Sequence, residues 1–246
     1  MKVAAIVVSH ANAAELVTLL PALAPQVEEL IVIANVPGSA PPGVEALRNA
    51  RPLGFAANLN LGLARTRSEA VLAVNPDAVP EPGAVAALRD FMAGHPRCGV
   101  AGPRMLFPDG APQPSRRRFP TVLGTLVRRT PLRRHVSQRR HLHLDEPAPS
   151  APVQSDWMLG GFLLLRRAML DELGGFDEKF RLYGEDIDLQ YRAMRAGWER
   201  WYVPSAVVRH EHKAETDKRF LTRRTLWHWA GIVRFVRKHP ERLRVL

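Results

Sequence analysis

The chain begins its regular structure at residues 2–35, with the stretch KVAAIVVSHANAAELVTLLPALAPQVEELIVIAN. Its first part is a short run rich in β-branched residues, which predicts a buried strand. Apolar residues then recur at helical spacing through NAAELVTLLPAL (12–23), and ELIVIAN (29–35) predicts a second strand. A strand, a helix and another strand in this order are typical of an α/β fold built on a parallel sheet.

The alternation continues after this unit. EALRNARPLGFAANLNLGLART (45–66) predicts a short strand, a glycine turn and a helix, and EAVLAVNPDA (69–78) predicts a strand that ends in polar residues. We therefore predict a mixed, mostly parallel sheet flanked by helices. Such sheets bind ligands beyond the carboxyl ends of their strands, where Ser9, Asn35 and Asp77 fall.

Positive charge is concentrated in two segments. Residues 104–143 carry ten arginines and one acid, residues 218–246 carry nine lysines and arginines and one acid, and the rest of the chain is net acidic. This distribution, without a finger, RNA-recognition or KH motif, argues against nucleic acid as a partner. It favours contact with an anionic substrate or lipid surface, and a solvated charge run is the alternative.

The domain organisation follows from the same patterns. We expect a catalytic domain over residues 1–217, containing a flexible basic loop at 104–150 where apolar periodicity fails, and a basic amphipathic helix at 218–246. One cysteine, Cys98, cannot form an internal disulfide, which fits a reducing, cytoplasmic compartment. No apolar run is long enough to predict a membrane span.

The C-terminal helix is predicted in TLWHWAGIVRFVRKHPERL (225–243). Its basic side carries Arg224, Arg234 and Lys238, which favours contact with the inner face of an anionic membrane. Packing of the apolar face on the catalytic domain is the alternative. Trp227 and Phe235 lie off that face and are expected to be free to reach lipid. The predicted apolar face consists of Leu226, Trp229, Ala230, Ile232, Val233 and Val236.

Three acidic or histidine elements follow predicted strands or open a helix: NPDA (75–78), GEDIDL (184–189) and His210 at the end of WYVPSAVVRH (201–210). Each alone has an ordinary structural explanation. An aspartate after proline is common in turns, acids at a helix N-terminus interact with the helix dipole, and a lone histidine is usually structural.

Together, several motifs between about Lys2 and His212 resemble the family 2 glycosyltransferases, particularly bacterial rhamnosyltransferases and related cell-surface polysaccharide enzymes. The motifs are VVSH, GFAANLNLG, NPD, WMLGGFLLLRR, LGGFDEKFRLYGEDIDLQYRAMRAGW and VPSAVVRH. The resemblance implies a GT-A fold, a nucleotide diphosphate sugar donor, a divalent cation and inversion at the anomeric carbon. A nucleotidyltransferase would carry a glycine-rich, lysine-bearing loop that SHANAAEL (9–16) lacks. A non-catalytic glycan-binding or lipid-surface-binding protein is the third hypothesis.

The resemblance also implies roles for individual residues. Asp77 and His210 are expected to bind Mn²⁺ or Mg²⁺, with His212 the poorer candidate, because a hard cation neutralises charge on a departing diphosphate. Asp186 is expected to be the catalytic base, and Glu185 is the next candidate. The residues expected on the donor side are Ser9, Asn35, Gly54, Asn60, Asn75 and Asp77.

The acceptor, a glycan or a polyprenyl-linked sugar, is expected beside Trp157, Gly160 and Gly161, where two glycines let the backbone approach a sugar closely. Arg116, Arg117 and Arg118 are expected to contact phosphate groups of the donor or acceptor from the basic loop, which closes over them. One departure from the family pattern concerns base recognition. Ala34 stands where family members usually carry a base-binding aspartate.

Overall fold

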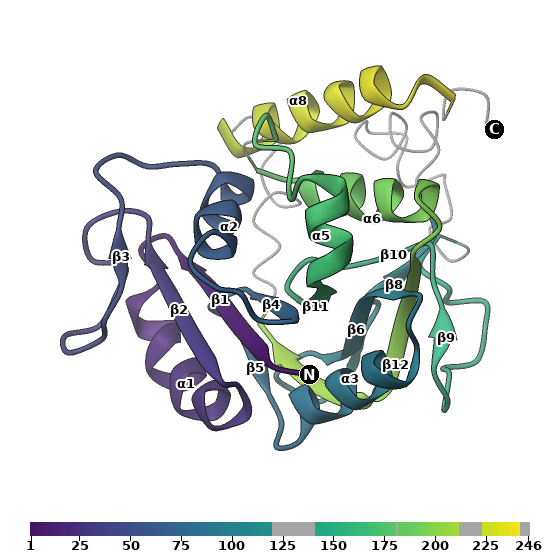
Figure 1. Ribbon diagram of the computed structural model, residues 1–246, viewed down its shortest axis with the longest axis horizontal. Helices are drawn as coiled ribbons and strands as arrows, with labels where there is room; N and C mark the ends of the chain where they lie inside the picture. Colours follow the sequence, from purple (N-terminus) through teal and green to yellow (C-terminus); the bar gives the residue numbers. More distant parts are fainter. Residues whose placement is uncertain (120–140, 181, 212–222, 242–246) are drawn as a thin grey trace.

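The computed structural model of the chain describes residues 1–119, 141–180, 182–211 and 223–241 (Figure 1). Strands and helices alternate through its first half, as the sequence predicts. In chain order the elements are β1 (Val3–Ser9), α1 (Ala13–Leu23), η1 (Ala24–Gln26), β2 (Glu29–Ala34), β3 (Leu47–Arg48), α2 (Phe55–Leu63), β4 (Ala70–Val74), β5 (Ala78–Pro80), α3 (Ala84–Gly94), β6 (Cys98–Leu106), β7 (Pro112–Gln113), β8 (Arg116–Arg117), β9 (Val153–Gln154), β10 (Trp157–Met158), β11 (Phe162–Arg166), α5 (Arg167–Leu173), α6 (Glu185–Arg195), β12 (Glu199–His210) and α8 (Arg223–Lys238).

The central sheet has the strand order β3-β2-β1-β4-β11-β6-β12-β5. Strands β3, β2, β1 and β4 pair in parallel, and β6 pairs in parallel with β12. Strand β11 lies between these two groups and is antiparallel to both β4 and β6. The sheet is therefore mixed and mostly parallel, which confirms the predicted architecture.

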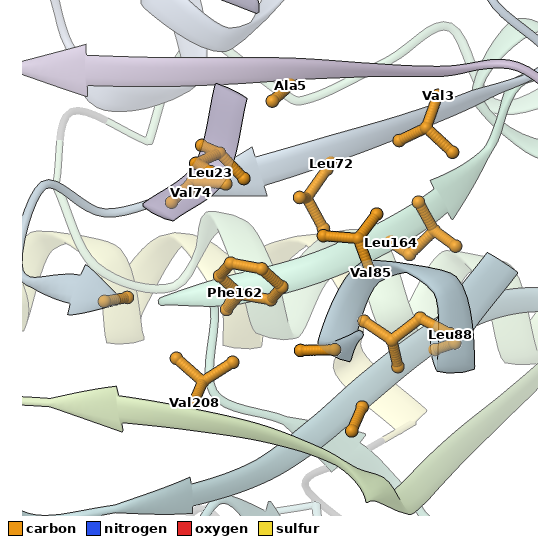
Figure 2. Packing of buried hydrophobic residues seen from close by; sticks show 14 of the residues in the cluster. Val3, Ala5, Leu23, Leu72, Val74, Val85, Leu88, Phe162, Leu164 and Val208 are labelled. Atoms are coloured by element: carbon orange, nitrogen blue, oxygen red, sulfur yellow. The ribbon is translucent and has the colours of Figure 1, made fainter. Parts of the chain in front are cut away.

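Helices cover both faces of the sheet, because side chains of each central strand alternate between the two faces. Val3, Ala5 and Val7 of β1 pack toward α1 and α3, and Phe162 of β11 joins them in one cluster of buried residues (Figure 2). Ile6 of β1 packs in the opposite direction, in a cluster with residues of α2, α5 and α6. The alternation on fully buried strands explains why their sequences are apolar throughout.

The basic segment begins with more regular structure than the sequence predicts. Arg104, placed at the start of the loop because it interrupts the apolar run, lies within β6: its side chain is exposed while Met105 is buried. Strands β7 and β8 follow, so the predicted loop at 104–150 contains three short strand segments within its described part. Residues 120–140, the centre of that loop, lie outside the described residues.

Strand β12 continues past Pro204 to His210. It pairs with β6 on both sides of Pro204, and the register shifts between Val203 and Val207. Proline has no backbone N–H to donate to a ladder, so it is accommodated at such an irregularity. The strand continues to His210 and thereby carries that residue to the end of the sheet where β4 also ends.

Helix α8 lies across α6 on the outside of the molecule (Figure 1). Its inward side is formed by Gly231 and Phe235, with His239 just beyond the helix, whereas Ala230 and Val233 of the predicted apolar face are exposed. The prediction that Phe235 is free to reach lipid is wrong, because its side chain is 7% exposed and its ring packs 5.6 Å from that of Tyr191. Within the part of the chain that the structure describes, no helix has the length and apolarity to cross a bilayer.

Candidate active site

The carboxyl end of β4, the start of β11 and the end of β12 form one edge of the sheet. Because β11 is antiparallel to β4, its first residues lie beside the last residues of β4. Asn75, directly after β4, donates its backbone N–H to the carbonyl oxygen of Gly161 at 2.8 Å. The topology therefore brings the NPD motif, the two glycines before β11 and His210 together.

Asp77 and His210 lie opposite each other at this edge. The Nε2 atom of His210 is 3.4 Å from Oδ1 of Asp77, and the histidine side chain is 5% exposed. The pairing of β12 with β5 supports this placement, because it sets His210 opposite Ala78, the residue that follows Asp77. A carboxylate oxygen and an imidazole nitrogen this close can bind one cation, as the sequence predicts.

The other ring nitrogen of His210 has a separate partner. Nδ1 of His210 lies 2.9 Å from Oε1 of the buried Gln113, which is in β7. Because an amide oxygen only accepts, Nδ1 carries the proton and Nε2 keeps its lone pair toward Asp77. This donor set fits a divalent cation. The described residues hold no group of three or more candidate ligands, and His212 lies outside those residues.

Gly160 and Gly161 lie between the proposed base and the proposed cation ligand. A β-carbon on Gly160 would be 2.9 Å from Cβ of Asp186, and one on Gly161 would be 3.3 Å from Nε2 of His210. The sequence assigns these glycines to a close approach by the acceptor. In the structure, the space that a side chain would need is already taken by Asp186 and His210.

Asp186 is placed by the start of α6. Its Oδ2 accepts the backbone N–H of Gly160 at 3.1 Å, and its Oδ1 accepts that of Ile187 at 2.8 Å. Burial raises the pKa of Asp186, an effect reduced by these two N–H groups and by the nearby Arg117 guanidinium. A carboxylate with a raised pKa is a stronger base than an ordinary aspartate.

Glu185 precedes Asp186 and is 7% exposed. Burial raises the pKa of its carboxyl from 4.5 to about 8, and the charge on Asp186 adds to the shift. Its Oε2 atom is buried without a hydrogen-bond partner among the described residues. Two acids whose environments resist ionisation therefore open the same helix.

The residues predicted on the donor side are mostly engaged with the protein itself. The hydroxyl of Ser9 is fully buried and donates to the carbonyl oxygen of Ser39 at 2.6 Å. The amide oxygen of Asn35 accepts from Asn49 and from the backbone N–H of Leu53, at 2.9 and 2.8 Å. These bonds fix the loops beyond β1 and β2.

The structure separates two asparagines of the GFAANLNLG motif. Asn58 accepts from Asn49 at 2.6 Å and donates to the carbonyl oxygen of Gly54, so Asn58 and Gly54 belong to the Asn35 network. Asn60 instead bonds the backbone of Phe176 through both its amide nitrogen and oxygen, at 2.9 and 3.0 Å. Residues two positions apart on an α-helix point about 200° apart around its axis. Asn58 and Asn60 therefore face different segments of the chain.

The predicted acceptor and phosphate residues lie around a small second sheet. β8 pairs with β10, and the guanidinium of Arg117 lies 5.3 Å from the centre of the Trp157 ring. Trp157 is 4% exposed, and its indole N–H donates to the carbonyl oxygen of Arg118. Arg116 and Arg118 both pair with Glu146, at 2.8 and 2.7 Å. Arg117, which also affects Asp186, is the arginine nearest to the predicted chemistry.

Sequence reasoning missed Gln113 and Asn58. Gln113 is a single amide between two prolines in a segment with no periodicity, and nothing in the sequence marks it as the partner of a histidine 97 positions later. Asn58 is different, because its position relative to Asn60 on the helix could have been used to decide which one faces Asn35.

Comparisons with known proteins agree on one family. The model described as "Glycosyltransferase like family 2" matches residues 3–230. The N-acetylglucosaminyl-diphospho-decaprenol L-rhamnosyltransferase of Mycobacterium tuberculosis is 36% identical over 207 residues, which cover 74% of this chain and 65% of that protein. Rhamnosyltransferase WbbL of Escherichia coli K12 is 35% identical over 82 residues, covering 33% of this chain and 30% of WbbL. The chain thus spans about two thirds of the mycobacterial relative and less of WbbL.

Solved structures share the fold. GalNAc-T7, solved with UDP, GalNAc and Mn²⁺, superposes with a TM-score of 0.65 at 14% identity, covering 100% of this chain and 51% of that one. The mannosyltransferase PcManGT from Pyrobaculum calidifontis, in complex with GDP-Man and Mn²⁺, gives 0.56 at 15% identity, covering 98% and 72%. The GT-A fold implied by the sequence resemblance is confirmed.

Proposed function

Because the chain belongs to glycosyltransferase-like family 2, we propose that it transfers a sugar, with inversion, from a nucleotide diphosphate sugar to a lipid-linked glycan. The observation that carries the proposal is the placement of Gly160–Gly161: the backbone N–H of Gly160 donates to Asp186, and a β-carbon on Gly161 would lie 3.3 Å from Nε2 of His210. A base and a cation-binding pair thus lie on opposite sides of two adjacent residues. A displacement at the anomeric carbon needs the two on opposite sides of the sugar.

Asp77 and His210 would hold the divalent cation, Mn²⁺ or Mg²⁺. When bound, the cation supplies positive charge against the diphosphate and makes it a better leaving group. The imidazole is oriented for this role by Gln113, and the carboxylate by the turn after β4. Two manganese-containing structures with the same fold support the choice of metal.

Asp186 would accept the proton of the acceptor hydroxyl. As that O–H bond breaks, the oxygen forms a bond to the anomeric carbon, and the nucleotide diphosphate leaves with the electron pair of the old glycosidic bond. The backbone N–H of Gly160 and that of Ile187 fix the Asp186 carboxylate in one orientation. Its raised pKa favours proton transfer in the transition state.

The acceptor and donor sugar are proposed from the relatives. The mycobacterial relative's name describes rhamnose transfer to an N-acetylglucosaminyl-diphospho-decaprenol, and WbbL is also a rhamnosyltransferase. We propose rhamnose as the sugar and a polyprenyl diphosphate sugar as the acceptor, in cell-envelope polysaccharide synthesis at the cytoplasmic face of the membrane.

The test combines product analysis with three variants. Wild-type protein, Mn²⁺ and a panel of dTDP-, UDP- and GDP-sugars are incubated with a polyprenyl-diphosphate N-acetylglucosamine, and the product's anomeric configuration is determined by NMR. Asp77→Ala and His210→Ala are expected to remove Mn²⁺-dependent binding of the nucleotide diphosphate in calorimetry. Asp186→Asn is expected to keep that binding and to slow transfer by about 10²- to 10⁴-fold.

Three outcomes would contradict the proposal. Unchanged Mn²⁺-dependent binding in both the Asp77 and His210 variants would exclude them as the cation ligands. Turnover of Asp186→Asn close to wild type would place the base elsewhere, with Glu185 the next residue to test. A product of retained configuration would exclude the single displacement.

We also propose that the outer side of α8 contacts an anionic membrane. A shallow hollow on α8 is lined by Ala230, Val233 and Arg237, together with Arg234 and Lys238, whose cationic groups also pair with Asp177. Flotation with anionic vesicles at low salt, but not with neutral vesicles, is the expected result. Val233→Glu, at a side chain that is 45% exposed, is expected to weaken it. A full chain that does not float with anionic vesicles would exclude this contact.

A further inference from the structure

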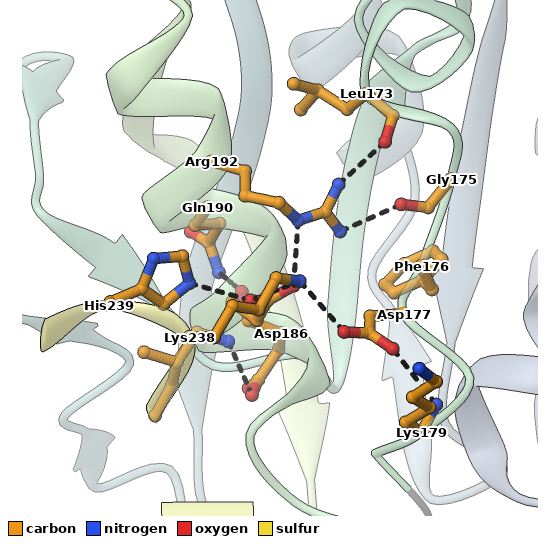
Figure 3. A network of polar contacts seen from close by, with 12 residues as sticks. Leu173, Gly175, Phe176, Asp177, Lys179, Asp186, Gln190, Arg192, Lys238 and His239 are labelled. Atoms are coloured by element: carbon orange, nitrogen blue, oxygen red, sulfur yellow. Dashed lines mark hydrogen bonds and ion pairs between the residues drawn. The ribbon is translucent and has the colours of Figure 1, made fainter. Parts of the chain in front are cut away.

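Two segments that lead to Asp186 are held by α8. The first is the loop of residues 174–184 between α5 and α6, and the second is the first turn of α6 itself. Asp188 in that turn is fully buried and accepts hydrogen bonds from Arg192, Lys238 and His239, at 2.8, 2.9 and 2.9 Å. Two of its three partners therefore come from the end of α8 and the residue after it (Figure 3).

The loop is tied to α8 by a second carboxylate. Asp177 accepts from Arg234 at 2.6 Å and from Lys238 at 2.9 Å. Lys238 thus bridges Asp177 in the loop and Asp188 in α6 (Figure 3). Arg192 of α6 completes the connection by donating to the carbonyl oxygens of Leu173 and Gly175 at the loop's beginning.

Helix α8 approaches the turn before α6 closely at Gly231. A β-carbon there would lie 2.5 Å from the carbonyl oxygen of Tyr183, so the helix can pack at this distance only because residue 231 has no side chain. Tyr183 has a φ of 69° and Gly184 a φ of 97°. The left-handed conformation is costly for a residue such as tyrosine and persists where the surroundings hold it.

We propose that α8 is a positioning element of the active site, in which Gly231, Lys238 and His239 hold the turn Tyr183–Gly184 and the first turn of α6. This inference rests on the proposed role of Asp186 as the base. Asp186 follows Gly184 by two residues and meets Gly160 through a single hydrogen bond of 3.1 Å. A small displacement of the turn would remove the carboxylate from the acceptor hydroxyl without touching the Asp77–His210 pair.

The principal variant is Gly231→Ala, with Gly94→Ala as the matched control. Alanine is the better helix former at both positions, so helix propensity alone predicts no loss. Gly94 ends α3, and a β-carbon there meets no atom within 4 Å. If α8 positions the turn, Gly231→Ala is expected to lower kcat by about 10-fold or more while changing the Mn²⁺-dependent affinity for nucleotide diphosphate less than twofold.

A second pair of variants tests the polar contacts. His239→Leu removes the donor to Asp188, whereas His239→Gln keeps an N–H that can reach the same carboxylate oxygen. We expect kcat to fall in the leucine variant and to be largely restored in the glutamine variant. This pair decides the question if Gly231→Ala does not fold, because it does not add a group against the Tyr183 carbonyl.

Hydrogen exchange gives a readout that is independent of catalysis. The amides of residues 184–188 are expected to exchange about 10-fold faster in Gly231→Ala and His239→Leu than in wild type, and unchanged in Gly94→Ala. If the wild-type chain transfers no sugar, the proposed function fails, and exchange still decides whether α8 holds the turn. Lower melting temperatures with unchanged kcat and unchanged exchange at these amides would overturn the inference and leave α8 a packing element only.

Discussion

At the scale of single residues, Gly160 and Gly161 are in contact with different parts of the proposed chemistry. Gly160 meets the Asp186 side chain, and Gly161 meets the His210 ring and the side-chain amide of Asn75. Because the two glycines have different neighbours, a substitution at one of them disturbs the proposed base and a substitution at the other disturbs the proposed cation site. The same substitution at both positions is therefore an internally controlled experiment.

Gly160→Ala is expected to displace Asp186 and to lower kcat by about 10²-fold, with Mn²⁺-dependent nucleotide binding unchanged. In Gly161→Ala the new β-carbon would lie 3.3 Å from Nε2 of His210, so the histidine ring has to shift. We expect this variant to weaken that binding by about 10-fold. Steady-state kinetics at saturating donor and calorimetry separate the two deficits. Identical deficits in the two variants would show that the glycines serve a common structural purpose instead.

Glu185 gives a prediction for the pH dependence of stability. Its folded pKa of about 8 exceeds the ordinary 4.5, so between these values the folded chain retains a proton that the unfolded chain has lost. The contribution of Glu185 to the free energy of unfolding is therefore fully present below pH 4.5 and declines as the pH rises to about 8. Glu185→Gln removes the ionisable group, and we expect the melting temperature of the variant to exceed that of wild type by an amount that grows from pH 5 to pH 8.

A melting-temperature difference between Glu185→Gln and wild type that is constant over this range would contradict the raised pKa. The unfolded chains differ by one carboxyl group only, so titrating residues remote from Glu185 cancel in the comparison, whereas Asp186, whose charge contributes to the Glu185 shift, responds to the substitution as well. Transfer activity should survive this substitution, because Asp186 keeps both of its backbone donors.

The positions of single residues could be predicted where a motif carried them, and their roles stay predictions. Asp77, Asp186 and His210 lie where the motifs and the strand ends place them, because parallel strands end at a common edge. Gln113 could not be predicted, since its contact with His210 joins positions 97 apart through a strand of two residues. Neither periodicity nor composition records such a contact.

At the scale of elements, β7 is short but supports the end of β12. It pairs with β6 through Met105 and Leu106 and thereby places Gln113 under the His210 ring edge that carries Nδ1. Metal-binding histidines are commonly fixed in this way, by an acceptor on the ring nitrogen that faces away from the metal.

We predict that Gln113→Leu weakens Mn²⁺ binding by about 10- to 100-fold, measured by electron paramagnetic resonance titration of the full chain with Mn²⁺ and nucleotide diphosphate. Gln113→Glu retains an acceptor for Nδ1 and is expected to bind at least as well as wild type. Equal affinities in all three proteins would show that His210 is oriented without this contact.

Helix α8 could be predicted from the sequence as an element, but the side of it that faces the protein could not. Its existence and amphipathic character follow from the sequence, and the structure has a helix over Arg223–Lys238. The side that faces the protein does not follow from apolar periodicity, because the docking contacts are a glycine, an aromatic ring, and the side chains of Arg234, Lys238 and His239 with carboxylate partners. Periodicity measures apolar content, and these contacts depend on shape and charge instead.

At the scale of the whole molecule, the position of β11 was beyond the sequence analysis. The motif WMLGGFLLLRR (157–167) was identified from the sequence, but not that its apolar part forms a strand that runs antiparallel between β4 and β6. Both neighbours precede it in sequence by more than 50 residues, since β4 ends at Val74 and β6 at Leu106. Strand pairing at such separation is decided by the global arrangement, which local patterns do not record.

This order has a consequence for the chain as it is being synthesised. When residues 1–106 have left the ribosome, β4 lacks the neighbour that β11 provides on one side, and β6 lacks the strand that lies between it and β4 in the finished sheet. An unpaired apolar strand is a site for association with other chains. We therefore expect the N-terminal half to be prone to association with other chains until residues 162–166 arrive to complete the sheet.

Stalled nascent chains would reveal this dependence. We expect residues 1–106 to be cleaved by a protease in chains released at residue 150 and to become resistant only in chains that extend beyond β12. Resistance already present at residue 150 would mean that the first half closes its own sheet. In that case β11 would have to displace a strand already paired with β4. The last step of folding would then be an exchange of strands, and its rate would limit how quickly a new molecule becomes active.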